Sequence, residues 1–68
     1  MSIEIQSHFN SINRYLSVFH KGYSLIMDEI GRFWIVTEKL SGEKIYVRYD
    51  IYNPNISKEV HNCLSCID

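Results

Sequence analysis

The residue types best suited to chemistry lie near the C-terminus, where Cys63-Leu64-Ser65-Cys66 forms a C-x-x-C motif with His61 two residues before it. On a helix, residues i and i+3 lie on one face, as a redox pair or half of a zinc site requires. A zinc site needs four ligands, and the chain has no second pair of cysteines unless a dimer supplies one. A redox pair usually begins a helix, where the dipole lowers the thiol pKa, whereas this pair lies near the end of one. We expect structural thiols, with zinc or redox chemistry at Cys63, Cys66 and His61 as the alternative.

The other groups able to move protons are His8, His20, His61 and the adjacent carboxylates Asp28 and Glu29. His20 lies where a helix is expected to end, and its charge suits the negative end of the dipole. Asp28 and Glu29 fall in a predicted hairpin turn, where we expect them to be solvated. A catalytic site needs a nucleophile, a base and an orienting group in mutual geometry, and this sequence does not bring them together. We predict that the protein is not an enzyme and has no cofactor.

The stretch from Tyr23 to Tyr52 organises the chain, because it holds three short apolar runs separated by two turns that end in Gly31 and Gly42. A type I turn followed by a residue with positive φ favours glycine at that place. This turn type fixes the register of the strands. In the first hairpin it sets Ile35 opposite Leu25. We predict an antiparallel meander with strands at about 23–28, 32–38 and 44–52.

Side chains alternate across a sheet, so this register assigns each residue to one of two faces. The first face is almost wholly apolar and carries Tyr23, Leu25, Met27, Phe33, Ile35, Thr37, Ile45, Val47, Tyr49 and Ile51. The second face has a charged rim around an apolar centre, and its candidate partner-binding residues are Ile26, Trp34, Val36, Tyr46, Arg48 and Tyr52. Binding hot spots are enriched in Trp, Tyr and Arg inside such rims. The alternatives are that one helix covers this face, or that Arg48 stacks over Trp34 and shields it.

Two amphipathic helices flank the meander. The first, at about 3–20, has Ser2 as a candidate cap and an apolar stripe of Ile5, Phe9, Ile12, Leu16 and Phe19. The second, at about 55–66, has Asn53, Asn55 or Ser57 as a candidate cap and a stripe of Ile56, Val60, Leu64 and Ile67. Both stripes must be buried, and the first face is the apolar surface available. We predict a single α+β domain over residues 1–68, of order α-β-β-β-α, with both helices on one face of the sheet.

The chain length and the net charge limit which classes of partner can be expected. A chain of 68 residues buries only about 60% of its unfolded surface, so a bound partner or a second copy is a natural source of stability. The net charge of −1 gives no general attraction to nucleic acid or membrane. The apolar runs are too short for a membrane span and residues 1–20 lack a signal-peptide core, so we expect a cytoplasmic protein. Ten isoleucines and no alanine suggest an AT-rich genome, of a bacterium or a phage.

The order helix, three strands, helix is similar to that of the double-stranded-RNA-binding domain. This resemblance of element order implies RNA contacts from helix 1, from the loop between the first two strands and from the start of helix 2. Here that loop is the acidic Asp28–Gly31, and the second helix begins with a single lysine, Lys58. A nucleic-acid binder is thus the second alternative, with sheet aromatics as stacking platforms. Our main hypothesis is a non-catalytic module that binds a protein partner or its own copy, such as a small regulator or inhibitor of a larger machine.

Overall fold

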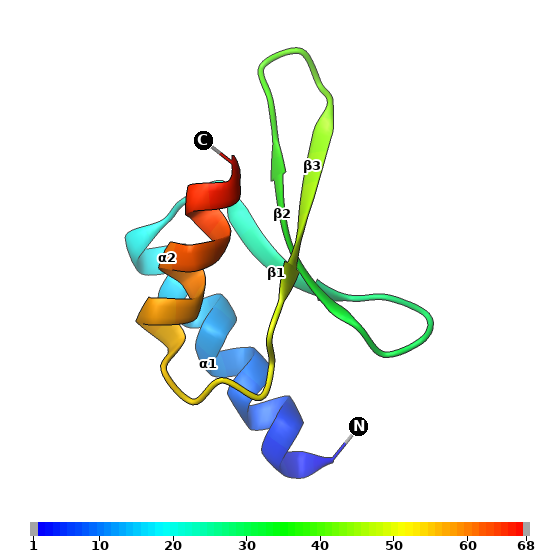
Figure 1. Ribbon diagram of the computed structural model, residues 1–68, viewed down its shortest axis with the longest axis vertical. Coiled ribbons are helices and arrows are strands. Elements are labelled where there is room, and N and C mark those ends of the chain that lie inside the picture. Colours follow the sequence, from blue (N-terminus) through cyan, green and yellow to red (C-terminus); the bar gives the residue numbers. More distant parts are fainter. Residues whose placement is uncertain (1, 68) are drawn as a thin grey trace.

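The computed structural model describes residues 2–67 as two helices and three strands. Their order is α1 (Ile3–Phe19), β1 (Tyr23–Met27), β2 (Phe33–Glu38), β3 (Lys44–Tyr49) and α2 (Ile56–Ile67). The strands form one antiparallel sheet in the order β1-β2-β3, so β2 is central. Both helices lie on the same side of the sheet, and the two hairpin loops project away from them (Figure 1). The predicted α-β-β-β-α architecture is confirmed.

The two hairpin turns set the register of the sheet. Gly31 and Gly42 have φ values of +88° and +91°, a region that residues with a Cβ rarely adopt. In the first turn, the Gly31 amide donates to the Asp28 carbonyl oxygen at 3.2 Å. Ile35 pairs with Leu25 on one side and with Val47 on the other. Both the positive φ values and the predicted register are confirmed.

The hydrophobic core lies between the first face and the two helices. Its buried members are Ile12, Leu16, Leu25, Phe33, Ile35, Tyr49, Ile51, Val60 and Cys63. Every strand residue among them belongs to the first face, while Ile12 and Leu16 come from α1 and Val60 and Cys63 from α2. Both helices therefore cover the first face, as the apolar stripes predicted. Phe19 at the end of the first stripe and Met27 at the end of β1 were also expected to be buried, but they are 67% and 45% exposed. The alternative in which one helix covers the second face is wrong.

α1 is fixed at its start and along its middle by side-chain hydrogen bonds. The Ser2 hydroxyl accepts from the Ile5 amide at 3.1 Å, which confirms the predicted cap. The Asn13 side chain accepts from the Leu25 amide at 2.9 Å and donates to the Leu25 carbonyl oxygen at 3.2 Å. This pair of bonds attaches α1 to the outer edge of β1.

β3 ends at Tyr49, three residues before the predicted end at 52. The Asp50 amide donates to Glu59 Oε2 at 3.1 Å, and the Asn53 amide donates to the Asp50 carbonyl oxygen at 3.2 Å. The Asn53 side chain donates to Glu59 Oε1, also at 3.1 Å. These bonds turn the chain toward α2, so residues 50–52 leave the sheet.

α2 begins after Asn55, whose side-chain oxygen accepts from the Lys58 amide at 3.1 Å. Among the three predicted caps, Asn55 is therefore the one that caps the helix. The remaining element bounds differ from prediction by at most one residue, as is common at helix and strand ends. Within residues 2–67, neither helix combines the length and the apolar character that crossing a membrane requires.

Candidate functional site

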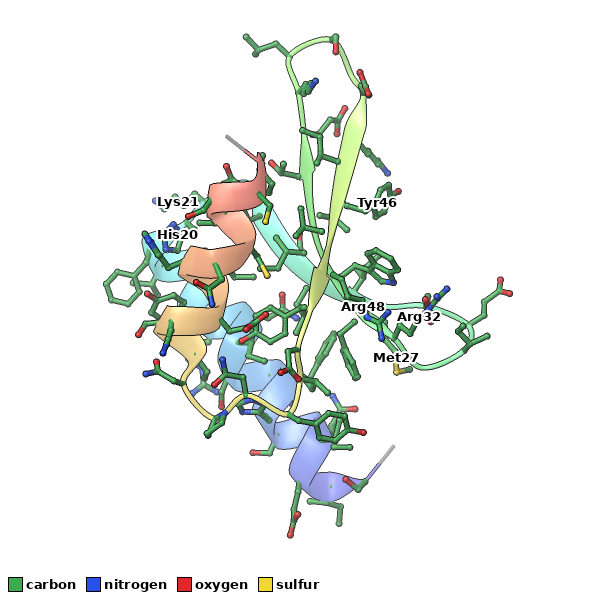
Figure 2. All side chains as sticks on the ribbon, viewed as in Figure 1. His20, Lys21, Met27, Arg32, Tyr46 and Arg48 are labelled. Atoms are coloured by element: carbon green, nitrogen blue, oxygen red, sulfur yellow. The ribbon has the colours of Figure 1, made fainter. Side chains whose placement is uncertain are left out.

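The second face is built by the alternating side chains of all three strands. Two cross-strand rows form its centre, Ile26–Trp34–Arg48 and Ser24–Val36–Tyr46. Tyr46 and Arg48 point away from the two helices (Figure 2). The face is therefore left open, because both helices are occupied by the first face.

The centre of this face is apolar and accessible. Tyr46 is 52% exposed and Ile26 is 38% exposed, while Trp34 and Val36 are half-buried. Ile26, Asp28, Trp34 and Tyr46 line an apolar depression between them. Exposed apolar groups that form one contiguous patch are typical of an interaction surface.

Three side chains hold the Trp34 ring in place. Its indole Nε1 donates to Asp28 Oδ2 at 2.9 Å. The guanidinium carbons of Arg32 and Arg48 lie 5.6 Å and 5.7 Å from the centre of the Trp34 ring, within cation–π range. The stacking of Arg48 on Trp34 that the shielding alternative expected is therefore present, and it leaves Trp34 half-buried. Arg32 adds a second cation that was not predicted.

Asp28 connects the first hairpin turn to Trp34. Its Oδ1 accepts from the amides of Ile30 and Arg32 at 3.0 Å and 2.8 Å, and its Oδ2 accepts from Arg32 Nε at 2.9 Å. Together with the Trp34 indole N–H, the strongest influence, these donors hold the pKa of Asp28 well below its ordinary value. Asp28 lies in the turn as expected, but four donors occupy its carboxylate and its side chain is only 24% exposed, so full solvation is the part of the expectation that is wrong. The available signal was aspartate at the first position of a turn, where its side chain readily accepts backbone amides.

The two arginines of this surface differ in their electrostatic partners. Arg32 forms an ion pair with Asp28 at 2.9 Å. Arg48 forms no ion pair with any other residue in the described range 2–67. Arg48 is exposed, so its guanidinium is accessible from the solvent.

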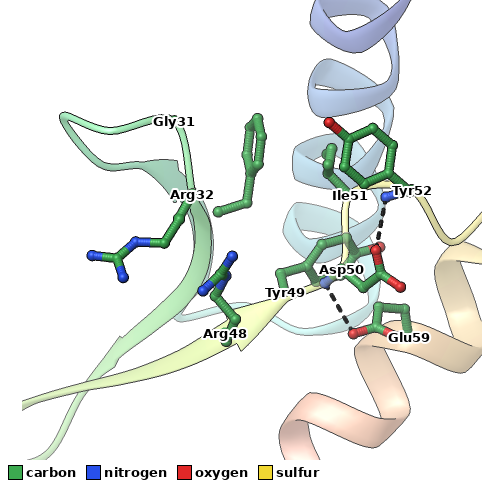
Figure 3. Close-up of a pocket in the computed structure, with 9 residues that line it drawn as sticks. Gly31, Arg32, Arg48, Tyr49, Asp50, Ile51, Tyr52 and Glu59 are labelled. Atoms are coloured by element: carbon green, nitrogen blue, oxygen red, sulfur yellow. Dashed lines mark hydrogen bonds between the residues drawn. The ribbon is translucent and has the colours of Figure 1, made fainter.

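Tyr52 does not belong to the second face, although it was predicted there. It lies on the turn after β3, where it is 81% exposed and its amide donates to Asp50 Oδ1 at 3.0 Å. Tyr52 and Glu59 line one side of a neighbouring pocket, and Arg32 and Arg48 line the other (Figure 3). The early end of β3 explains this displacement.

The cysteine pair has one buried and one exposed thiol. Cys63 Sγ lies 3.3 Å from the Arg48 carbonyl oxygen and 3.6 Å from Glu59 Oε2, so its proton has two acceptors. Burial and the neighbouring Glu59 carboxylate raise the pKa of Cys63 to about 12. A thiolate is needed for redox attack or zinc ligation, and this environment opposes it. Across residues 2–67, three or more potential metal ligands do not gather anywhere.

The structure thus brings together all the predicted partner-binding residues except Tyr52. The histidines remain apart from this surface. His20, for example, packs its ring against Tyr15 at 5.7 Å and Tyr23 at 6.5 Å between ring centres.

Comparisons with family models, with curated proteins and with solved structures find no match to this chain.

Proposed function

We propose that this protein is a non-catalytic interaction module that binds a protein partner through the second face. The observation that carries this proposal is the accessible Tyr46 and Ile26 beside an already ordered Trp34, on a face that neither helix covers. Trp34 and Tyr46 are the anchors, and Arg48 orients the partner. A small regulator or inhibitor of a larger assembly fits a domain of this size.

Preorganisation of Trp34 supports this assignment. Immobilising a flexible side chain on binding costs about 0.5–1.5 kcal/mol. The bond to Asp28 and the two flanking arginines already fix the ring, so that cost falls on folding and not on association. Burying the exposed parts of Tyr46 and Ile26 then contributes about 25 cal/mol per Å² of apolar surface.

Arg48 supplies direction to this otherwise apolar contact. It has no carboxylate partner within residues 2–67, and it lies in the same cross-strand row as Trp34. A carboxylate of the partner would meet both the guanidinium and the edge of an apolar patch. Charge complementarity of this kind fixes orientation and raises the association rate.

The experiment compares two exposed apolar residues that lie on different surfaces. Tyr46 lies on the second face, whereas Leu40 lies fully exposed in the turn between β2 and β3. Tyr46→Ala and Leu40→Ala are each examined by sedimentation over a range of concentrations and by capture of partners from the source cell. Thermal melting of both variants shows whether the fold is kept.

We expect Tyr46→Ala to weaken association about tenfold or more, because an anchor contributes at least about 2 kcal/mol. Leu40→Ala should leave association unchanged. The proposal is contradicted if the two variants associate equally well. Binding that falls steeply with salt on mixed oligonucleotides would instead favour the nucleic-acid alternative.

A further inference from the structure

The outward backbone groups at the two edges of the sheet are hydrogen-bonded to different extents. At β1, Asn13 occupies both the amide and the carbonyl oxygen of Leu25. At β3, residues of α2 occupy only the end of the strand, where the Cys63 thiol meets the Arg48 carbonyl oxygen and Glu59 accepts from the Asp50 amide. These contacts do not extend to the earlier part of the β3 edge.

The alternation of backbone groups shows which residues form this open part. The Glu43 carbonyl oxygen points to the side of β2 and accepts from Lys39, the residue after that strand, while the Arg48 carbonyl oxygen points toward α2. Outward and inward groups alternate along an antiparallel strand, so Lys44 and Tyr46 are outward like Arg48. No group in the described part of the chain bonds to the outward amides and carbonyl oxygens of Lys44 and Tyr46. β3 therefore presents a short row of free donors and acceptors, which is a template for another strand.

The side chains along this edge define what the added strand would carry. Lys44, Tyr46 and Arg48 all lie on the second face, at every second position of β3. Residues directly opposite one another on paired strands are favourable when their charges are opposite or when both are apolar. The complementary strand has acidic residues opposite Lys44 and Arg48, and an apolar residue opposite Tyr46.

We propose that an extended acidic segment of another protein adds to β3 as a fourth strand. Its recognition pattern is acidic, any residue, apolar, any residue, acidic. This inference rests on the proposed function and specifies its partner. Backbone bonds to Lys44 and Tyr46 give affinity, and the two cations select the acidic sequence.

A second copy of this chain is a poorer occupant of the same edge. Antiparallel pairing of two β3 strands about Tyr46 sets Lys44 of each copy opposite Arg48 of the other. Like charges directly opposite one another are destabilising, and here this happens twice. The charge pattern of β3 therefore favours an acidic segment over self-pairing.

The probe is a capped, fluorescein-labelled synthetic peptide that contains Glu-Val-Phe-Val-Glu between short Ser/Thr flanks. The control peptide has lysine in place of both glutamates. Each is titrated into the full chain and followed by fluorescence anisotropy. We expect the glutamate peptide to bind about tenfold more tightly, because two favourable charge pairs replace two unfavourable ones. Equal binding of the two peptides would overturn the charge selection.

A pair of variants isolates the backbone contribution. Tyr46→Pro removes the outward N–H without removing a bond to β2, and proline is tolerated at such edge positions. Tyr46→Ala loses the same ring but keeps the N–H. We expect the proline variant to bind the glutamate peptide about three- to tenfold more weakly than the alanine variant, as one hydrogen bond predicts.

Hydrogen exchange on the unmodified protein keeps the proposal testable if the proline variant does not fold. The outward amides of Lys44 and Tyr46 should exchange slowly only when the glutamate peptide is bound. Unchanged exchange at Tyr46 would overturn strand addition, even if Tyr46→Ala still weakens partner association as the proposed function expects. Protection of Tyr46 without peptide, rising with protein concentration, would assign the edge to a second copy.

Discussion

Neighbouring residues of β2 have opposite environments. Ile35 is 0% exposed beneath the two helices, whereas Trp34 and Val36 on either side of it face away from them. The same strand therefore supplies the centre of the core and the centre of the candidate binding surface. In a chain of 68 residues, two helices suffice to cover one sheet face. The opposite face is stabilised by contacts of its own, such as those of Asp28, Arg32 and Arg48 with Trp34.

The largest difference in stability between the two faces is expected when neighbouring residues on opposite faces are truncated. Ile35→Ala leaves a cavity beneath both helices and should lower the free energy of unfolding by about 2–5 kcal/mol. Val36→Ala removes half-exposed atoms and should cost less than about 1 kcal/mol. Denaturant unfolding measures both. Equal losses would show that the second face is as tightly packed as the first.

The two hairpin turns set the register of both faces. Replacing the glycine of either turn by alanine should lower the stability of the fold by a similar amount. Gly31→Ala and Gly42→Ala each force a Cβ into positive φ, which costs about 1–2 kcal/mol. A Cβ at Gly31 would meet no atom within 4 Å, and one at Gly42 would only touch Glu38 Oε1 at 4.0 Å. Strain without a clash is expected at both sites, and thermal melting compares them. A markedly larger loss at either glycine would contradict this equivalence.

Acid should weaken the contacts that Asp28 makes on the second face. The folded-state pKa of Asp28 lies below its ordinary value of 3.8, so its ionised form stabilises the fold. That contribution is complete above about pH 4–5 and is lost as the pH falls below 3.8 toward the folded-state pKa. Stability curves of the wild type and of Asp28→Asn should converge at low pH. Parallel curves down to pH 2 would contradict this role of Asp28.

The smallest effect is expected at the exposed cysteine. Cys66→Ser should change the free energy of unfolding by no more than about 0.5 kcal/mol, as for other surface positions. Cys63→Ala should cost more, because Cys63 is buried against the Arg48 carbonyl oxygen. Metal analysis accompanies these unfolding measurements. Stoichiometric zinc in the wild type, lost in both variants, would favour the zinc alternative.

Local patterns were sufficient to predict most of the fold. Period-two alternation and two turn glycines predicted the register, and two apolar stripes predicted which face the helices cover. The end of β3 could not be predicted, since it depends on Glu59 reaching back to the Asp50 amide across nine residues of sequence. The position of Tyr52 depends on that strand end, so it could not be predicted either.

The candidate site was predicted less completely than the fold. Alternation placed Ile26, Trp34, Val36 and Tyr46 together, because side-chain direction in a strand is a local property. The contributions of Asp28 and Arg32 come from side-chain geometry across a folded turn. Their distances to Trp34 exist only once the hairpin has closed.

Quenching of Trp34 fluorescence by acrylamide tests the central claim most directly, because Trp34 is the single tryptophan of the chain. The measurement is made on the isolated protein and on its assembly with a captured protein partner. We predict measurable quenching in the isolated protein and a clear decrease when the second face is covered. Identical quenching in both states, with association demonstrated by sedimentation, would show that the partner binds elsewhere.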